Sequence, residues 1–410
     1  MSTLSDDPHT RLADDPRTRP VIALHPGKQR RAERGHPWIY SNEVRMEPAA
    51  KALAPGSVVT VADAGGKRLG VALFNPQPLV SLRLLDRRAD TVIDQAFLER
   101  RLARARDIRD RLFAEPFYRL IHAEADGLPG LVIDRYGDAL VCQLNSAGMD
   151  RLEPLLLAAL DAVLAPETVV LRNDSPARQL EGLAMETRIA KGSADTPFQV
   201  RENGSLFRAD LSAGQKTGWF FDQRPNRALV AQLAKGATVL DTYCFAGGFG
   251  VQAAVAGASH VTLLDRSEPA LKLAMAAAEE NGVAGRCSAL RGEAFETLEK
   301  LHAEGKRFDI VVLDPPAFVK SKKDLGPGSR GYRKLNRLGA ALVAPGGYLF
   351  SASCSHNMPL EAFAEAVAMG IADAGRTARL LHTGGAGLDH PAHPFLPESA
   401  YLKGQLLALD

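Results

Sequence analysis

Two segments of the sequence combine a reactive side chain with the expected end of a strand. Cys354 stands between Ser353 and Ser355, at the end of an apolar run that predicts a strand over residues 347–354. A helix expected from about residue 359 follows it, and a helix N-terminus with polar neighbours lowers the pKa of a thiol. Asp314 ends a second apolar run, 308–314, and the two prolines after it stop the strand and hold the chain rigid. If the two strands are neighbours, their ends lie about 5 Å apart, and thiol and carboxylate share one site. The alternative for Asp314 is an ordinary loop, where Asp-Pro pairs are common.

A glycine-rich segment predicts a second, adjoining site. Residues 241–250 read Asp-Thr-Tyr-Cys-Phe-Ala-Gly-Gly-Phe-Gly, between a predicted strand over 238–244 and a predicted helix over 248–257. Glycines let a ligand approach the backbone beside a helix N-terminus. The spacing does not match the dinucleotide GxGxxG pattern, and Asp241 suits a ligand with a cationic amino group. Asp265, at the end of the next predicted strand, is placed to accept both hydroxyls of a ribose, and Glu293 begins a loop expected near an adenine ring. We therefore predict a nucleoside site, with a purely structural turn as the alternative.

A basic segment follows the Asp-Pro-Pro motif. Residues 320–337 hold seven basic side chains against the single acid Asp324, which is typical of a solvated helix face. Beside the predicted site, the same run favours contact with a phosphate backbone. The predicted RNA contacts are Lys320, Lys322, Lys323, Arg330 and Arg333.

The other candidate ligands and thiols have structural interpretations. Cys142 and Cys287 read as small core hydrophobes, and Cys244 as a wall of the nucleoside site. His390 and His393 have the spacing of a metal pair but no third ligand is evident, so we predict no metal.

The chain as a whole has the composition of a globular protein of several domains. It has 410 residues, 50 basic against 48 acidic side chains, and a formal charge of +2, which excludes a strongly polybasic coat protein. No apolar run is long enough to span a bilayer, the N-terminus lacks a secretory signal, and the four cysteines are scattered. These features predict a cytoplasmic protein without membrane insertion.

Three folded regions must position these residues. Residues 1–19 predict a disordered tail, and residues 20–98 a small β domain with strands over 57–62, 69–74 and 79–85. Residues 99–208 predict a central α+β domain, introduced by a helix over 96–113 with six arginines, Arg109 among them, around its polar side. Residues 209–410 alternate strand and helix, which predicts a doubly wound, Rossmann-like parallel sheet.

Several of these motifs together resemble a known family, the three-domain, RlmI-type bacterial 23S rRNA methyltransferases that depend on S-adenosylmethionine. The matching segments are residues 35–44, 126–136, 215–224, 314–318, 353–355, 389–391 and 402–404, so the resemblance covers nearly the whole chain after its first nineteen residues. It implies a PUA-like RNA-binding domain over 20–98, a central domain, and a class I methyltransferase domain over 209–410. Large-subunit rRNA is then the partner, and a homodimer is left open.

The family's chemistry is methylation of cytosine C5. The resemblance implies that Cys354 attacks C6 and that Asp314 hydrogen-bonds the N3/N4 edge of the base. It places the methionine part of the cofactor among Asp241, Phe245, Gly247 and Gly248, with Arg224 at its carboxylate, and it carries over Asp265, Glu293 and Asp314 as further cofactor contacts. Many cytosine-C5 RNA methylases have a second cysteine in the Asp-Pro-Pro motif, where this chain has Pro316 and Ala317, so the group that assists release is not identified.

Three alternatives stay open at this point. Asp314-Pro-Pro with Phe318 also resembles the loop that orients an exocyclic amino group or ring nitrogen for methylation, which needs no thiol. A non-catalytic RNA-binding protein with a vestigial cofactor site is the second, and a nicotinamide oxidoreductase is the third.

Overall fold

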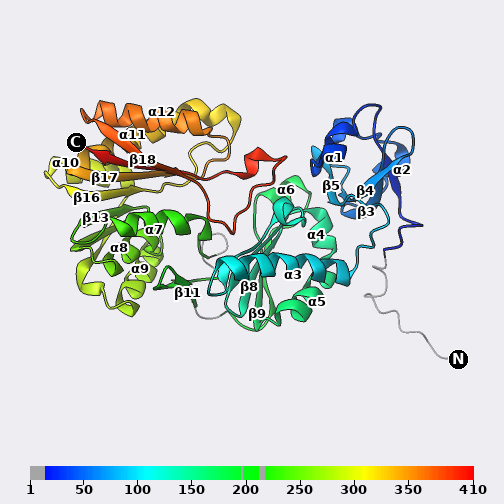
Figure 1. Ribbon diagram of the computed structural model, residues 1–410, viewed down its shortest axis with the longest axis horizontal. Coiled ribbons are helices and arrows are strands. Elements are labelled where there is room, and N and C mark those ends of the chain that lie inside the picture. Colours follow the sequence, from blue (N-terminus) through cyan, green and yellow to red (C-terminus); the bar gives the residue numbers. More distant parts are fainter. Residues whose placement is uncertain (1–13, 195–196, 212–217) are drawn as a thin grey trace. The chain divides into compact units, whose positions relative to one another are not determined.

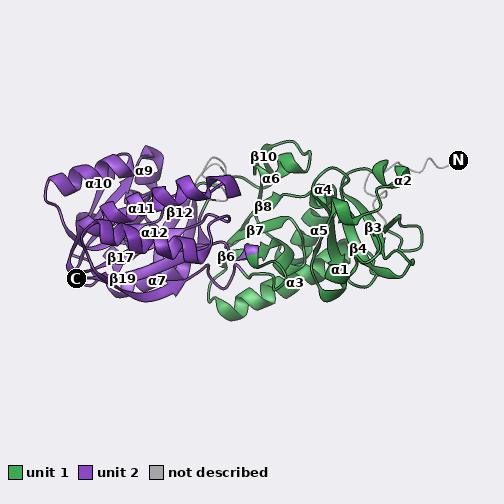
Figure 2. Cartoon of the chain, turned by 90° about the horizontal axis from the view of Figure 1, so that it is seen from above, with its two compact units in different colours: residues 1–196, 210–218, 391–397 green, residues 197–209, 219–390, 398–410 purple. Residues whose placement is uncertain are grey.

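The computed structural model describes residues 14–194, 197–211 and 218–410. The chain divides into two compact units, coloured in Figure 2. Unit 1 comprises residues 1–196, 210–218 and 391–397, and unit 2 comprises residues 197–209, 219–390 and 398–410.

Unit 1 begins with a five-stranded sheet that confirms the small N-terminal β domain. Its order is β1 (Val21–Ala23), β3 (Ser57–Ala62), β4 (Arg68–Phe74), β5 (Val80–Asp86) and β2 (Trp38–Tyr40), with the short helices α1 (Arg30–Arg34) and α2 (Pro48–Lys51). Alternating apolar side chains of these strands form one core with Ile22, Leu24 and Phe74 at its centre. Gly70 in β4 has φ +156°, and a Cβ there would lie 2.3 Å from the carbonyl oxygen of Asp86, so this close strand contact requires glycine.

The rest of unit 1 is a second five-stranded sheet covered by helices (Figure 1). The sheet order is β10 (Glu186–Lys191), β9 (Thr168–Asn173), β8 (Ala139–Leu144), β7 (Leu131–Tyr136) and β6 (Phe117–His122). The helices are α3 (Gln95–Leu112), α4 (Ala147–Arg151), α5 (Glu153–Leu164) and α6 (Ala177–Leu180). This confirms a mixed α and β region in the centre of the chain.

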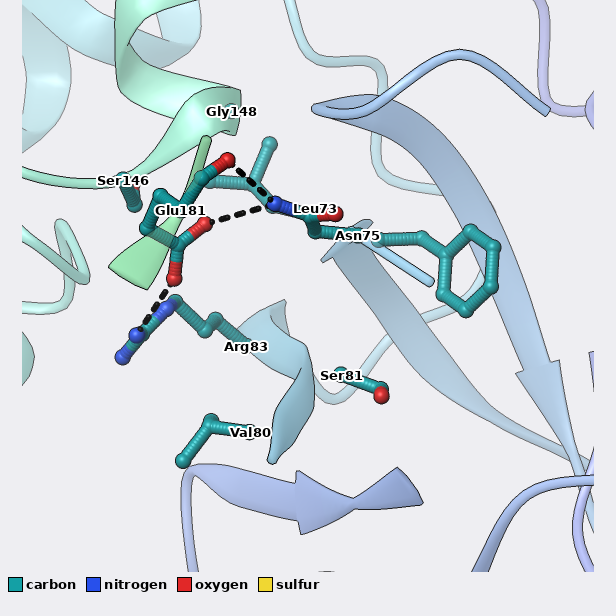
Figure 3. Close-up of a pocket in the computed structure, with 9 residues that line it drawn as sticks. Leu73, Asn75, Val80, Ser81, Arg83, Ser146, Gly148 and Glu181 are labelled. Carbon is teal, nitrogen blue, oxygen red and sulfur yellow. Dashed lines mark hydrogen bonds and ion pairs between the residues drawn. The ribbon is translucent and has the colours of Figure 1, made fainter. Parts of the chain in front are cut away.

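A small polar hollow inside unit 1 is lined by residues of β4, β5, α4 and the segment after α6 (Figure 3). Arg83 forms ion pairs with Glu181 at 2.8 Å and with Glu124 at 3.1 Å. The Asn75 side-chain amide donates to the Glu181 carboxylate at 3.0 Å. These contacts among the lining residues stabilise unit 1. Because the polar groups already bond one another, the hollow gives no indication of a ligand site.

Unit 2 is built on a seven-stranded sheet that confirms the doubly wound fold. Its order is β15 (Cys287–Arg291), β14 (His260–Asp265), β13 (Thr238–Thr242), β16 (Phe308–Leu313), β17 (Val343–Ser353), β19 (Lys403–Leu409) and β18 (Ala378–Gly384). The first five strands run parallel, and β19 is antiparallel to both of its neighbours. A hairpin of β11 (Phe198–Glu202) and β12 (Ser205–Ala209) packs on this unit.

Helices cover both faces of that sheet (Figure 1). One face carries α7 (Arg224–Gln232), α8 (Gly248–Val255) and α9 (Glu268–Glu280), and the other carries α10 (Ala294–Ala303), α11 (Leu325–Leu342) and α12 (Leu360–Asp373). The parallel strands end at one edge, and the order reverses around β13, which is where open α/β sheets bind ligands. Among the described residues, no helix combines the length and apolar character needed to cross a bilayer.

The structure differs from the sequence-based expectations in several places. The predicted tail lies outside the described residues up to residue 13, but Arg19 is buried and donates to the carbonyl oxygens of Ala89 and Thr91, which orders residues 14–19. Strands β15, β18 and β19 were not predicted. The β11–β12 hairpin, assigned to the central region over 99–208, belongs to unit 2. The domain boundaries themselves stay predictions.

Arg109 was predicted on the polar side of a helix, and this is wrong. Its side chain is 1% exposed and forms a two-point ion pair with Asp126, at 2.6 and 2.8 Å. Asp126 also accepts from the backbone N–H of His122 at 2.6 Å, and Arg109 donates to the carbonyl of Arg119. The guanidinium is buried because its acceptors lie on β6 and on the turn that follows it, against which α3 packs.

We expect Asp126→Ala to destabilise unit 1 by about 3–5 kcal/mol, because it leaves the Arg109 charge buried without its carboxylate. Differential scanning calorimetry measures this as a lower transition temperature. Asp107→Ala, which removes an exposed carboxylate from the same helix, is the control and is expected to change stability little. Equal effects of the two substitutions would contradict the assignment.

Candidate functional site

The ends of β16 and β17 bring the Asp-Pro-Pro motif and Cys354 together. The strands pair in parallel with Leu313 opposite Ser351, so each enters its loop at the same edge of the sheet. The Cys354 sulfur lies 3.9 Å from the carbonyl oxygen of Pro315, the residue after Asp314. The structure therefore unites the thiol and the motif that the sequence analysis paired.

Cys354 differs from the other three thiols in its exposure. It is half-buried, whereas Cys142, Cys244 and Cys287 are buried. Burial raises the pKa of the Cys142 and Cys244 thiols well above the usual range, and that of Cys287 to about 11. Burial disfavours the thiolate form of these three cysteines, so the half-buried Cys354 is the better candidate nucleophile.

Asp314 is oriented by a glutamine that the sequence analysis did not assign. Gln223 donates from its side-chain nitrogen to the Asp314 carboxylate at 2.8 Å. The amide oxygen of Gln223 accepts from Asn226 at 2.6 Å, which fixes which end of the Gln223 amide faces Asp314. Gln223 and Asn226 are both buried. Only the resemblance of residues 215–224 marked this segment, and residues 215–217 of it lie outside the described residues.

A buried chain of hydroxyls holds the loop around Cys354. Ser353 donates to the Tyr332 phenol at 2.8 Å, and that phenol bonds the Ser355 hydroxyl at 2.9 Å. Ser355 also accepts from the backbone N–H of Val319, just beyond the Asp-Pro-Pro motif, at 3.1 Å. The serines on either side of the thiol thus connect β17, α11 and the motif loop, and they keep the Cys354 backbone in place.

Lys403 is a second functional candidate that the sequence analysis did not assign. It begins β19 opposite Ser353 and is buried. Its ammonium donates to the carbonyl oxygens of Ser355 and Tyr401, both at 2.7 Å. Burial lowers the pKa of Lys403 to about 8, while interaction with Cys354 acts in the opposite direction. The sequence alone does not show that Lys403 lies beside Cys354. The two come together only through the antiparallel pairing of Ser353 with Lys403, which are 50 residues apart in the chain.

Asp241 ends β13 beneath the glycine loop. One carboxylate oxygen accepts from the backbone N–H of Gly250 at 2.8 Å, and the other is buried without a hydrogen-bond partner among the described residues. Burial raises the pKa of Asp241 to about 7, Asp314 adds to the rise, and the Gly250 hydrogen bond and Arg227 oppose it. A buried oxygen of this kind fits a donor supplied by a ligand.

The glycine loop has an unusual backbone that turns it toward Asp265. Tyr243 and Phe245 have φ of +58° and +49°, a conformation that side chains rarely adopt and that clusters at functional sites. Asp265 accepts from the N–H of Phe245 at 3.0 Å and from Ser267 at 2.8 Å. The loop and the carboxylate predicted to hold the ribose are therefore in direct contact.

The predicted cofactor residues occupy the following positions. Gly247 has φ +80° and precedes α8, and a Cβ on Gly248 would lie 2.5 Å from the Arg227 guanidinium. Glu293 is exposed at the start of α10 and lies 3.7 Å from Arg266. Arg224, predicted at the ligand carboxylate, lies 3.6 Å from Glu202 and over the ring of Phe221, and its contact with a ligand stays a prediction.

Glu202, on the β11–β12 hairpin, accepts several hydrogen bonds behind the glycine loop. Its carboxylate accepts from Arg227 at 2.7 Å, from Gln252 at 3.0 Å and from the Trp219 indole at 2.9 Å. It is buried, so these bonds compensate its charge. Because Arg227 packs against Gly248, the hairpin supports the loop from behind.

The predicted RNA contacts lie in and before α11 and are all exposed. Lys320, Lys322 and Lys323 precede the helix, and Arg330 lies in its first half. Arg333 forms a two-point ion pair with Asp373 of α12, at 2.6 and 2.8 Å, so part of its charge is neutralised within the protein. In the part of the chain that the structure describes, no cluster of three or more side chains could hold a metal ion.

We expect Asp241→Asn to stabilise the cofactor-free protein more at pH 8.5 than at pH 5. The folded-state pKa of about 7 lies above the ordinary 3.8, so wild-type stability is lost as the pH rises through 7, and asparagine does not titrate. The difference in unfolding free energy between the two pH values is about 2–3 kcal/mol. Thermal unfolding of both proteins at each pH measures it. A difference that does not change with pH would contradict the buried carboxyl, and Asp107→Asn is the exposed control.

Comparison with known proteins gives the chain its family. A family model for S-adenosylmethionine-dependent methyltransferases matches residues 172–403, and one for PUA-like domains matches residues 22–87. The ribosomal RNA large subunit methyltransferase I of Pseudoalteromonas atlantica is 36% identical over 387 residues, which cover 93% of this chain and 98% of the relative. The protein of the same name from Shewanella denitrificans is 37% identical over 388 residues, with the same coverage.

Solved structures share the fold. A methyltransferase complexed with SAH has a TM-score of 0.81 at 21% identity, over 95% of this chain and all of that one. A SAM-dependent methyltransferase from Streptococcus mutans has a TM-score of 0.79 at 22% identity, over 94% of this chain and all of that one. With its PUA-like domain, its methyltransferase domain and its close relatives over nearly the full length, the chain belongs to the S-adenosylmethionine-dependent ribosomal RNA large subunit methyltransferase I family.

Proposed function

We propose that this protein methylates C5 of a cytosine in large-subunit rRNA, with Cys354 as nucleophile. The observation that carries the proposal is the half-buried Cys354 thiol 3.9 Å from the Pro315 carbonyl, directly after Asp314. The rRNA substrate follows from the names of the relatives. An rRNA substrate and free, scattered cysteines favour the cytoplasm, and a homodimer stays a prediction.

The residues around the glycine loop fit S-adenosylmethionine. The buried Asp241 oxygen suits the cationic amino group of the methionine part, and Asp265 suits the ribose hydroxyls. Phe245, Gly247 and Gly248 line the loop between them. When bound, this cofactor supplies a methyl group made electrophilic by the sulfonium. Arg224 begins α7, 3.6 Å from Glu202, and we keep it as the proposed contact for the methionine carboxylate.

The reaction needs a nucleophile because C5 of cytosine is a weak one. The Cys354 thiolate forms a bond to C6, and the electrons of the C5–C6 double bond shift toward C4, which makes C5 nucleophilic. C5 would then take the methyl group as the bond from that group to the sulfonium sulfur breaks and S-adenosylhomocysteine leaves. Loss of the C5 proton to a base then restores the double bond, and its electrons expel the thiolate. The protein thus begins and ends the cycle with the same sulfur anion.

Asp314 binds the base during attack. Its carboxyl group meets the N3/N4 edge of cytosine and, when protonated, draws electrons from the ring as C6 is attacked. Gln223 donates to one oxygen of this carboxyl group at 2.8 Å and so orients it at the end of β16. This requires the target nucleotide to be unpaired or flipped out of its helix.

Methylation of an exocyclic amino group or ring nitrogen is the competing chemistry, and the packing of Phe318 argues against it. That chemistry uses the aromatic residue after Asp-Pro-Pro to stack on the target base. Here the Phe318 ring is partly buried and packs between Phe295, at 6.2 Å, and Tyr332, at 4.7 Å between centroids, against the core of unit 2.

Cys354→Ala is expected to lower methyl transfer at least about 10³-fold and to leave SAH binding within about twofold, because it removes only the covalent step. Label transfer to unmodified large-subunit rRNA and calorimetric titration with SAH measure the two effects. Cys287→Ala, at a buried thiol, is the matched control and retains transfer.

A second readout identifies the base. RNA containing 5-azacytosine is expected to form a denaturant-stable complex with the wild type and none with Cys354→Ala. Nucleoside mass spectrometry then reports 5-methylcytosine. An active Cys354→Ala enzyme, or a methylated purine, would overturn the proposal in favour of nitrogen methylation.

Replacing Lys320, Lys322 and Lys323 together by alanine is expected to weaken rRNA binding. If all three contact phosphates, the slope of log affinity against log salt becomes shallower by about 2–3. Filter binding at several salt concentrations measures the slope. The double substitution Lys235→Ala/Lys272→Ala removes exposed charges elsewhere on unit 2 and is expected to leave it unchanged. An unaltered slope in the triple variant would remove this segment from the RNA interface.

A further inference from the structure

Among the described residues, Lys403 is the one buried lysine, and it lies beside the candidate nucleophile Cys354. A buried ammonium costs free energy unless several acceptors surround it. Its two hydrogen bonds go to the carbonyls of Ser355 and Tyr401, at 2.7 Å each, and both acceptors are neutral. The positive charge therefore has no carboxylate partner in these contacts, although arginine–carboxylate pairs are common elsewhere in the protein. A site that holds a cation in this way is suited to an anion that forms only during the reaction.

The pairing of β19 with β17 places Lys403 close to one group that can become an anion, the Cys354 thiol. Lys403 lies directly opposite Ser353 in the antiparallel β17–β19 ladder, one residue before Cys354. Its ammonium bonds the carbonyl of Ser355, one residue after Cys354. Lys403 therefore contacts the residues on both sides of Cys354. We propose that the Lys403 ammonium stabilises the Cys354 thiolate and so activates the nucleophile for attack; this rests on the role of Cys354 in the proposed function.

The local electrostatics agree in direction. Interaction with Cys354 raises the pKa of Lys403, against the larger effect of burial. Interaction energies are reciprocal, so the same charge favours the ionised form of the thiol. With a pKa of about 8, Lys403 is largely protonated at pH 7 and carries the charge that this role requires.

Other titratable groups face the same region, and their ionisation also contributes to the pH dependence of Cys354 reactivity. They are Asp314 after β16, Tyr332 on α11, His356 after β17, His382 on β18, and Tyr401, whose phenol donates to Asp222 at 2.5 Å. Asp314 stands beside the Cys354 loop at the end of β16, and in its ionised form it disfavours a thiolate. Because a like charge opposes ionisation of Cys354, a compensating cation is needed more here than at an isolated thiol.

The test measures the thiolate directly and needs no RNA. The rate of Cys354 alkylation by iodoacetamide is followed by mass spectrometry of its peptide between pH 6 and 10, in wild type, Lys403→Met, Lys403→Gln and Lys403→Arg. Lys403→Met is expected to slow alkylation at pH 7 about tenfold and to move the midpoint of the profile to higher pH. Lys403→Arg keeps the charge and is expected to stay within about threefold of wild type. Lys272→Met, at an exposed lysine on α9, is the control and leaves the profile unchanged.

Lys403→Gln guards against misfolding, because its amide still donates to the two carbonyls and lacks only the charge. A folded Lys403→Gln or Lys403→Met protein with the wild-type alkylation profile would overturn the inference, and so would equal slowing by Lys403→Arg. The proposed function is judged separately by Cys354→Ala: transfer that persists in that variant ends the cytosine-C5 mechanism, whatever alkylation shows about Lys403.

Discussion

The functional site depends on the parallel pairing of β16 with β17. Leu313 and Ser351 lie opposite each other in this pair, so the two chains leave the sheet at nearly the same level. Two prolines stop β16 at once, and the Pro315 carbonyl comes to lie 3.9 Å from the Cys354 sulfur. A shift of the register by two residues would displace these groups by about 6–7 Å and separate them. The aliphatic packing of unit 2, which fixes this register, is therefore also what assembles the chemistry.

The residues behind the site keep it rigid through hydrogen bonds that contribute no chemistry themselves. Tyr332 joins the two serines that flank Cys354, and Gln223 orients Asp314. On the other side of β13, Glu202 holds Arg227 against the glycine loop. Tyr332, Gln223, Glu202 and Arg227 are all buried, and buried polar groups are costly unless they are bonded. The same bonds that satisfy them restrict the loops to one geometry, which is what a reaction between two substrates requires.

Sequence patterns were sufficient for the parts of the fold that are local. The continuous apolar runs at 238–244 and 308–314 predicted buried parallel strands, and the glycine loop predicted the start of α8, because both signals lie within a few residues. Strands β18 and β19 were missed because their pairing is antiparallel and joins segments far apart. The prediction for Arg109 was wrong for a related reason. Helical periodicity indicates an exposed arginine, but Arg109 forms a buried ion pair with Asp126, which lies on a later turn. In the site, Cys354 and Asp314 stand at strand ends, a position that sequence reveals, whereas Gln223 and Lys403 act through contacts that only the tertiary structure provides.

The Asp-Pro-Pro loop has no second cysteine that could assist release of the product, and the position of Lys403 offers an explanation. Many cytosine-C5 RNA methylases have a second thiol that assists release, and here Pro316 and Ala317 occupy that place. A thiolate stabilised by a neighbouring cation is formed more readily at neutral pH, and it is also the better leaving group, because thiols of lower pKa depart faster. In the proposed mechanism, the ammonium that favours attack on C6 therefore also favours departure from C6 once the C5 proton is lost. On this view the rigid Asp-Pro-Pro loop and the buried lysine complement each other: the prolines exclude a second thiol from the loop, and the charge on β19 makes that thiol unnecessary.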